Sequence, residues 1–247
     1  MYSYRKYFSI NLNYKIINKL VTEFQIDTLY NINELPLLNI NKEFFKIEFS
    51  GYFNGKINDL LVDYLPKSIN YIKFGVRFDQ SVDDLPKNIT ELTFGSDFDQ
   101  KVDNLPENII NLTFGSCFNQ KVDNLPKNII NLTFGFSFNQ KVDNLPKKIT
   151  HLTFGKFFNK KIDNLPKNIT CLTFGNYFNE KIDNLPESIT HLIFGCDFNQ
   201  KIDNLPKNIT HLTFGKKFNQ VTHNLSKNII KLTFGHDFDP IVTLVEF

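Results

Sequence analysis

Residues 198–215 read Phe-Asn-Gln-Lys-Ile-Asp-Asn-Leu-Pro-Lys-Asn-Ile-Thr-His-Leu-Thr-Phe-Gly, and this string decides the fold because it recurs along most of the chain. Its Phe-Gly step occurs nine times, always 20 residues apart, from Phe74 to Phe234. A second phenylalanine follows four residues after the first in every copy, so the nine copies hold 18 of the 27 phenylalanines. A period sustained in this way indicates a repeat protein rather than an ordinary globular domain.

Each repeat unit predicts a short strand followed by a turn. Leu212 and Phe214 alternate with Thr213, which is the period of a strand with one buried face. We expect Gly215 to adopt a backbone conformation that residues with a Cβ avoid, and so to turn the chain out of the strand. Pro206 and the shortness of the unit leave no room for a full helix on the other side of the coil. Stacked coils of this kind predict a mainly β solenoid of about ten coils with a parallel sheet on one face.

The same string resembles the FNIP repeat, a motif related to leucine-rich repeats and abundant in social amoebae and in large DNA viruses that infect amoebae. The resemblance covers about residues 46–239, with small departures, since aspartate replaces the asparagine of the motif at Asp79, Asp99 and Asp239. It implies a curved, leucine-rich-repeat-like solenoid that is used for protein interaction. It implies no chemical reaction.

Three parts are expected along the chain. Residues 1–45 are predicted to be an N-terminal capping segment, residues 46–240 the FNIP-type repeat solenoid, and residues 241–247 a C-terminal tail. Within the first part, five apolar residues fall on one helical face, which predicts a capping helix over residues 14–26. These residues are Ile16, Ile17, Leu20, Val21 and Phe24.

Two further features of the repeat predict how the coils begin and how they are joined. Ile47, Phe49 and Phe53 predict a degenerate first coil, in which Ser50 stands in place of the glycine. The asparagine that follows the second phenylalanine recurs from Asn119 to Asn219. Stacked asparagines predict a ladder of hydrogen bonds between coils rather than a binding site.

Composition and charge exclude several classes of protein. The 28 basic and 26 acidic residues leave a net charge of +2, so we expect no nucleic-acid partner. No apolar run approaches the ~18 residues of a membrane span, so we expect no membrane partner. The first residues lack the apolar core of a signal peptide, and three cysteines without paired spacing predict a reducing compartment. We therefore expect a monomer in the cytoplasm, or in the host-cell cytoplasm if the protein is viral.

The sequence carries no recognisable catalytic motif. It has no serine–histidine–acid set, no glycine-rich phosphate loop and no metal-ligand motif. We therefore predict a non-enzymatic protein-interaction module that uses no cofactor and binds a protein partner whose identity is unknown. Some proteins with FNIP repeats carry an N-terminal F-box that docks a ubiquitin-ligase scaffold. The alternative that this resemblance implies is a substrate-recognition adaptor, in which residues 1–45 dock the ligase.

The first candidate binding positions lie immediately before the buried leucine of each strand. By strand alternation these positions face the exposed, concave surface, and in four successive coils they hold His151, Cys171, His191 and His211. Zinc accepts such ligands, but a flat ladder at ~4.8 Å spacing brings at most two neighbours together, such as His191 and His211. We predict an exposed polar surface and no metal centre, and binding by that pair stays open.

The second candidate positions lie in the turn after the glycine, where three consecutive coils hold Phe136, Phe157 and Tyr177. Clustered surface aromatics are candidate anchors for a binding partner. The alternative is that each ring folds over the neighbouring loop and helps to close the core. The protein-binding hypothesis as a whole comprises Phe136, His151, Phe157, Cys171, Tyr177, His191 and His211.

Overall fold

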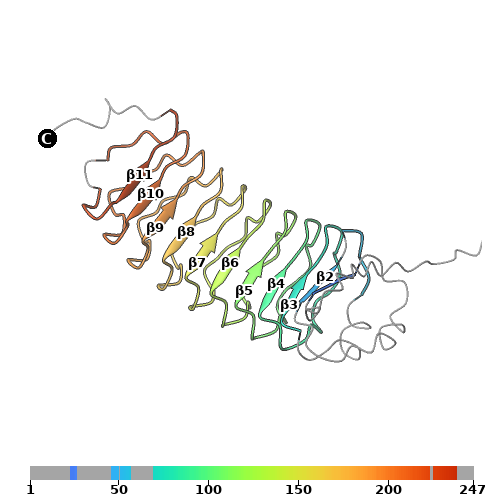
Figure 1. Ribbon diagram of the computed structural model, residues 1–247. Coiled ribbons are helices and arrows are strands. Elements are labelled where there is room, and N and C mark those ends of the chain that lie inside the picture. Colours follow the sequence, from blue (N-terminus) through green and yellow to red (C-terminus); the bar gives the residue numbers. More distant parts are fainter. Residues whose placement is uncertain (1–22, 27–45, 50, 57–68, 223–224, 238–247) are drawn as a thin grey trace, which may run out of the picture.

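A computed structural model describes residues 23–26, 46–49, 51–56, 69–222 and 225–237 of the 247-residue chain. These residues form one 11-stranded sheet in which the strand order follows the chain from β1 to β11 (Figure 1). Every neighbouring pair of strands is parallel and joined in strict register, so that the coils stack into an elongated array. This architecture confirms the predicted mainly β, leucine-rich-repeat-like solenoid.

The strands are short because each coil contributes only the residues around its buried leucine. In β7, for example, Leu152 is buried while His151 is exposed and Thr153 is half-buried. The strands are β1 Glu23–Ile26, β2 Lys46–Phe49, β3 Tyr71–Lys73, β4 Glu91–Thr93, β5 Asn111–Thr113, β6 Asn131–Thr133, β7 His151–Thr153, β8 Cys171–Thr173, β9 His191–Ile193, β10 His211–Thr213 and β11 Lys231–Thr233.

The predicted capping helix over residues 14–26 is wrong at its C-terminal end. Residues Glu23–Ile26 form β1, which pairs in parallel with β2 and sets Glu23 opposite Lys46. The sequence Glu-Phe-Gln-Ile alternates polar and apolar residues, and pairing with β2 satisfies its backbone groups, so the strand prevails there over the helical pattern. Residues 14–22 lie outside the described residues. No helix occurs in the part of the chain that the structure describes.

The degenerate first coil is confirmed. Ile47 and Phe49 lie in β2 and are buried, and Phe53 is buried four residues after Phe49. The ring of Phe49 stacks on that of Phe74 in the next coil, with centroids 5.1 Å apart. The first repeat therefore joins the same core despite the loss of its glycine.

Two columns of phenylalanine rings fill the core along the whole array. Within one coil the rings of Phe114 and Phe118 stack with centroids 3.7 Å apart. Phe114 also stacks on Phe134 of the next coil at 5.7 Å, and Phe118 stacks on Phe138 at 6.1 Å. Burial of aromatic side chains supplies most of the apolar area that stabilises such a core. Each interior ring of the two columns is buried against three other phenylalanine rings, as Phe114 is against Phe94, Phe118 and Phe134.

The spacing between successive coils increases from the strand face toward the interior and beyond. Outside the sheet, the imidazole rings of His191 and His211 have centroids 4.3 Å apart. Inside it, successive rings of the first phenylalanine column are 5.5–5.7 Å apart. Rings of the second column are 6.0–6.1 Å apart. Because parallel strands pair at about 4.8 Å, this widening makes the strand face the concave one.

The repeated glycine is required by close packing and not by an unusual backbone conformation. None of the repeat glycines from Gly95 to Gly235 has a φ in the left-handed region between +20° and +160°, so the expectation for Gly215 is wrong in its physical cause. A Cβ placed on Gly115 would overlap the backbone carbonyl of Gly95 in the preceding coil. The same overlap recurs at each glycine up to Gly235. Only glycine lets the backbones of successive coils approach so closely at this point.

The predicted asparagine ladder is confirmed. The backbone N–H of Asn139 donates to Oδ1 of Asn119 at 2.9 Å, and Nε2 of Gln140 donates to the same oxygen at 3.2 Å. Aspartate serves equally well, since Oδ1 of Asp99 accepts the backbone N–H of Asn119 at 2.8 Å. The ladder needs an oxygen acceptor at each step, which explains why the Asp79 and Asp99 departures are tolerated.

Candidate protein-binding surfaces

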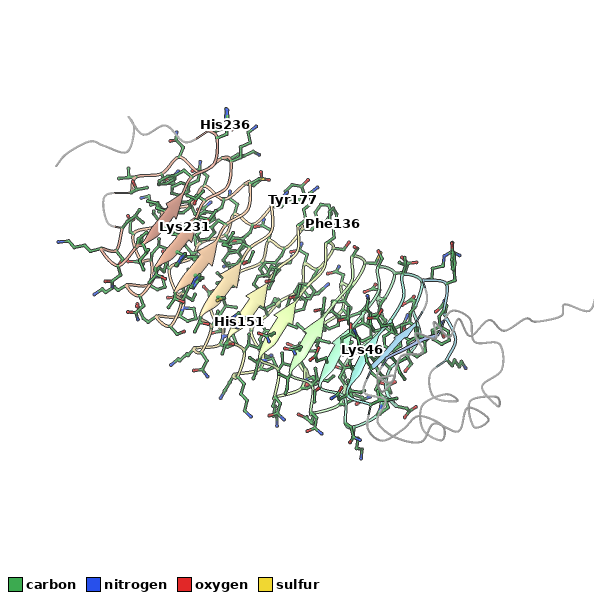
Figure 2. The ribbon with its side chains drawn as sticks, in the orientation of Figure 1. Lys46, Phe136, His151, Tyr177, Lys231 and His236 are labelled. Carbon is green, nitrogen blue, oxygen red and sulfur yellow. The ribbon has the colours of Figure 1, made fainter. Side chains whose placement is uncertain are left out.

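The structure divides the seven predicted binding residues between two places. Phe136, Phe157 and Tyr177 lie in the loops that follow the strands, along one long edge of the array. His151, Cys171, His191 and His211 are the first residues of their strands and lie on the strand face. Figure 2 shows this separation, with Phe136 and Tyr177 on the upper edge and His151 at β7. The two sets therefore form separate surfaces.

The three aromatic residues contact one another across consecutive coils. The rings of Phe136 and Phe157 meet edge to face, with centroids 4.8 Å apart and an interplanar angle of 82°. The rings of Phe157 and Tyr177 are 5.0 Å apart and tilted by 56°. The three side chains nevertheless remain 44%, 40% and 41% exposed, respectively. They fold over neighbouring loops, as one interpretation expected, but they leave a continuous apolar surface in solvent.

Lys156 completes this group. Its Nζ lies 4.9 Å from the centroid of the Phe136 ring and 5.5 Å from that of Tyr177. Both distances lie within the range in which an aromatic face attracts a cation. Lys156 is not among the binding residues predicted from the sequence, although it directly precedes Phe157 and occupies the repeat position of Phe136 one coil later. We call Phe136, Lys156, Phe157 and Tyr177 the aromatic cluster.

Backbone hydrogen bonds hold the loops of the aromatic cluster in register. The N–H of Phe157 donates to the carbonyl oxygen of Phe136 at 3.0 Å, and the N–H of Tyr177 donates to that of Lys156 at 3.0 Å. The same bond joins successive loops along the array, as between Lys217 and Cys196 at 2.8 Å. The rings therefore stand on a fixed backbone, which lowers the entropy lost when a partner binds.

Two coils further on, the same loop positions carry ion pairs instead of rings. Nζ of Lys217 lies 2.9 Å from Oδ1 of Asp197, and Nζ of Lys216 lies 3.9 Å from Oδ2 of Asp237. The hydrogen bond to Asp197 raises the pKa of Lys217 above its ordinary value. Solvent screens exposed pairs of this kind, so we interpret this stretch of the edge as a solvated charged surface.

On the strand face, each histidine is tied to the threonine before it. Nδ1 of His191 lies 2.9 Å from Oγ1 of Thr190. That hydroxyl also donates to the carbonyl oxygen of Thr170 at 3.2 Å, so Thr190 links the imidazole to the backbone of the preceding coil. His211 has the same arrangement through Thr210.

The structure does not bring these four side chains together around one point. The rings of His191 and His211 are nearly parallel, with an interplanar angle of 9°, so their in-plane lone pairs do not converge on one point. No group of three or more histidine, cysteine, aspartate or glutamate side chains is placed to hold a metal ion among the described residues. Cys171 is a free thiol beside Oγ1 of Thr170 at 3.9 Å.

The N-terminal end of the strand face is charged. Glu48 lies 3.4 Å from Lys46 and 3.5 Å from Lys73, and Nζ of Lys46 lies 4.7 Å from the centre of the Tyr71 ring. Partial burial and, next, the charge of Glu48 raise the pKa of the Tyr71 hydroxyl. The strand face therefore changes along the array from ion pairs to the histidine and cysteine column.

One surface was missed by sequence analysis. Ile110 and Ile130 occupy the position before the strand that holds threonine in most coils, and both are 37% exposed. They line a shallow groove of about 510 Å³ together with Asn88, Thr90, Asn108, Asn128 and Lys148. The signal that could have found it is the change from threonine to isoleucine in two adjacent repeats.

The parallel sheet, the stacked phenylalanines and the concave strand face place this chain in the class of leucine-rich-repeat-like solenoids. The FNIP repeat model matches residues 78–117, 118–157, 158–197 and 198–224, which together make up more than half of the chain. The chain therefore belongs to the FNIP repeat family.

A solved structure supports this assignment. The chain is similar to the crystal structure of CroV588, described as a novel circular LRR protein structure, with 38% sequence identity and a TM-score of 0.71. The match covers 81% of this chain but only 36% of that chain. The chain thus spans about a third of its solved relative. A search of the curated proteins found no match.

Proposed function

We propose that this chain is a non-catalytic protein-interaction module that binds its partner through the aromatic cluster. A repeat scaffold of the leucine-rich-repeat type is consistent with such a role, and scaffolds of this family are typically not enzymes. The observation that carries the proposal is the exposure of three rings on consecutive loops, in which Phe157 contacts both Phe136 and Tyr177. Aromatic anchors that stand on a rigid backbone typically dominate the affinity of an interface.

The strand-face column adds a second contact surface on the same coils. Phe157 and His151 belong to one coil, as do Tyr177 and Cys171, so a partner that wraps over the loop edge would meet both surfaces on the same coils. Extended concave faces are the surfaces that solenoid proteins offer to partners. We propose that the aromatic cluster anchors the partner. The strand-face residues His151, Cys171, His191 and His211 would then form the polar periphery of the interface.

The test compares two double variants once a partner has been isolated with the full chain. We expect Phe157→Ala with Tyr177→Ala to weaken binding at least about tenfold, because each buried aromatic anchor carries ~2 kcal/mol. The matched control is Lys216→Ala with Lys217→Ala, on the same edge, which should leave affinity nearly unchanged. Unchanged circular dichroism would show that both variants fold. Equal affinities for the two double variants would sink the proposal.

The alternative role of ubiquitin-ligase adaptor stays a prediction. Its docking segment, residues 1–45, lies outside the described residues apart from β1. Because β1 pairs with β2, removal of all 45 residues would also strip a strand from the sheet. Deletion of residues 1–22 is the cleaner variant, and loss of a co-purified ligase scaffold on that deletion would favour the adaptor.

No helix that could cross a membrane occurs within the described ranges.

A further inference from the structure

The cation at the centre of the aromatic cluster points to the chemistry of the partner. We propose, resting on the function proposed above, that the cluster binds an acidic segment of a protein in which a carboxylate side chain stands next to an apolar or aromatic one. The rings of Phe136, Phe157 and Tyr177 would take the apolar side chain. The Lys156 ammonium would take the carboxylate.

The charge of Lys156 is not neutralised within the described part of the chain. Its ammonium contacts only the faces of two rings, and no carboxylate there lies within ion-pair distance of it. The lysines of the loop three coils further on differ in this respect. Lys217 is paired with Asp197, and Lys216 is paired with Asp237. Lys156 is therefore the loop-edge lysine that offers its charge to a partner.

The surroundings of Lys156 favour an anion. The neighbouring loop-tip residues Ser116, Ser137 and Asn176 are uncharged, and the next acidic residue along the edge, Asp197, is already paired. A carboxylate that enters here meets a positive charge, and the loop-tip residues on either side of that charge are uncharged. Its hydrogen bond to the ammonium would be charge-assisted, and such bonds are roughly twice as strong as neutral ones.

The same geometry argues against a cationic partner. Clustered aromatic rings often bind ammonium groups, since ring faces attract cations. In this cluster, however, the ammonium of Lys156 already occupies the space over Phe136 and Tyr177. A lysine or arginine of a partner would meet a like charge there, which costs free energy. The cluster therefore selects anionic over cationic segments.

The direction of the segment follows from the repeat. The three rings come from three consecutive coils whose loops are joined in register by backbone hydrogen bonds. A bound segment that contacts all three rings must run along the loop edge and across the coils. Lys156 lies between the outer two rings, so the carboxylate belongs near the middle of that segment.

Three sets of synthetic seven-residue peptides test the proposal against the full chain. The sets share varied flanking residues and two central phenylalanines, and they differ only in having glutamate, glutamine or lysine between these. We expect the glutamate set to bind about tenfold more tightly than the glutamine set, as for one charge-assisted hydrogen bond, and the lysine set to bind most weakly. Added salt should reduce the difference between the sets.

Variants separate the partner chemistry from the proposed function. Lys156→Gln should equalise the glutamate and glutamine sets, and Lys156→Glu should make the lysine set bind best. The matched control Lys216→Gln should leave the preference as it is. If Phe157→Ala with Tyr177→Ala leaves glutamate binding intact, then the aromatic cluster is not the binding surface and the proposed function fails. If that double variant abolishes binding while Lys156→Gln keeps the glutamate preference, only the assignment of the charge fails. Equal binding of the three sets by the native chain, or no binding, also overturns the proposal.

Discussion

The interior coils and the C-terminal coil carry nearly the same residues but bury them to different extents. Leu172 in β8 is 1% exposed, whereas Leu232 at the same repeat position in β11 is 39% exposed. β8 pairs with a strand on each side, while β11 pairs only with β10 among the described residues. The difference in burial therefore comes from the neighbouring coil and not from the unit itself.

This difference shows where the stability of the solenoid resides. A 20-residue coil cannot enclose its own apolar side chains, so each coil is stabilised mainly across its two interfaces with neighbouring coils. The interfaces consist of ring stacking, close glycine backbone contacts and the asparagine ladder. Substitutions in an interior coil should disturb two interfaces, and those in the C-terminal coil should disturb one.

The largest effect is expected at Phe174, whose ring stacks on Phe154, Phe178 and Phe194. Phe174→Ala should lower the free energy of unfolding by about 3–5 kcal/mol, the usual loss for a core phenylalanine. Chemical denaturation measures it, with the exposed Lys181→Ala as control. A loss no greater than that of the control would contradict the inward stacking of the column.

The next effect concerns the glycine contacts. A Cβ at Gly155 would overlap the backbone carbonyl of Gly135, so Gly155→Ala must push two coils apart. We expect a loss of about 1–3 kcal/mol or more in the free energy of unfolding, as for other overpacked sites. Gly51→Ala is the matched control, because a Cβ at Gly51 has no atom within 4 Å. If both variants melt at the same temperature, close packing is not the reason for the repeated glycine.

Most of the fold could be predicted because a strict sequence period determines which residues of successive coils lie opposite one another. Once Leu212 is assigned to the core, the same assignment follows for Leu192 and for the other interior copies at 20-residue spacing. Two predictions failed because they depended on a neighbour that the local sequence does not show. Glu23–Ile26 became a strand by pairing with β2, and the repeated glycine is set by the carbonyl of the coil before it.

The candidate site was predictable only in part, for the same physical reason. Strand alternation correctly placed His151 and His211 on the outer face. It could not show that Lys156 lies over the rings of Phe136 and Tyr177, since these three side chains come from three different coils. Nor could it show that the histidine rings stack in parallel, which decides against convergence on a metal.

A smaller effect is expected from the asparagine ladder. Asn119→Ala would remove the oxygen that accepts the backbone N–H of Asn139 and the side chain of Gln140. The site is only part-buried, so water compensates in part and we expect a loss of about 1–2 kcal/mol. Asn119→Asp keeps the acceptor, as Asp99 does one coil earlier, and should be nearly neutral. Thermal melts of both variants measure these changes in stability. If Asn119→Ala and Asn119→Asp lose the same stability, the side-chain oxygen acceptor is not what residue 119 contributes.

The smallest effect is expected at Leu232 in β11, which pairs only with β10 among the described residues. Leu232→Ala should cost about 1 kcal/mol, because a side chain that is already 39% exposed loses less apolar burial than a fully enclosed one. Leu172→Ala, the same change at the matching interior position, should cost about 2–5 kcal/mol. Denaturant titrations of the two variants measure the difference, which is the contribution of the second neighbouring coil at this position. Equal losses at Leu172 and Leu232 would contradict this prediction, because they would show that the second neighbouring coil adds nothing to stability at this position.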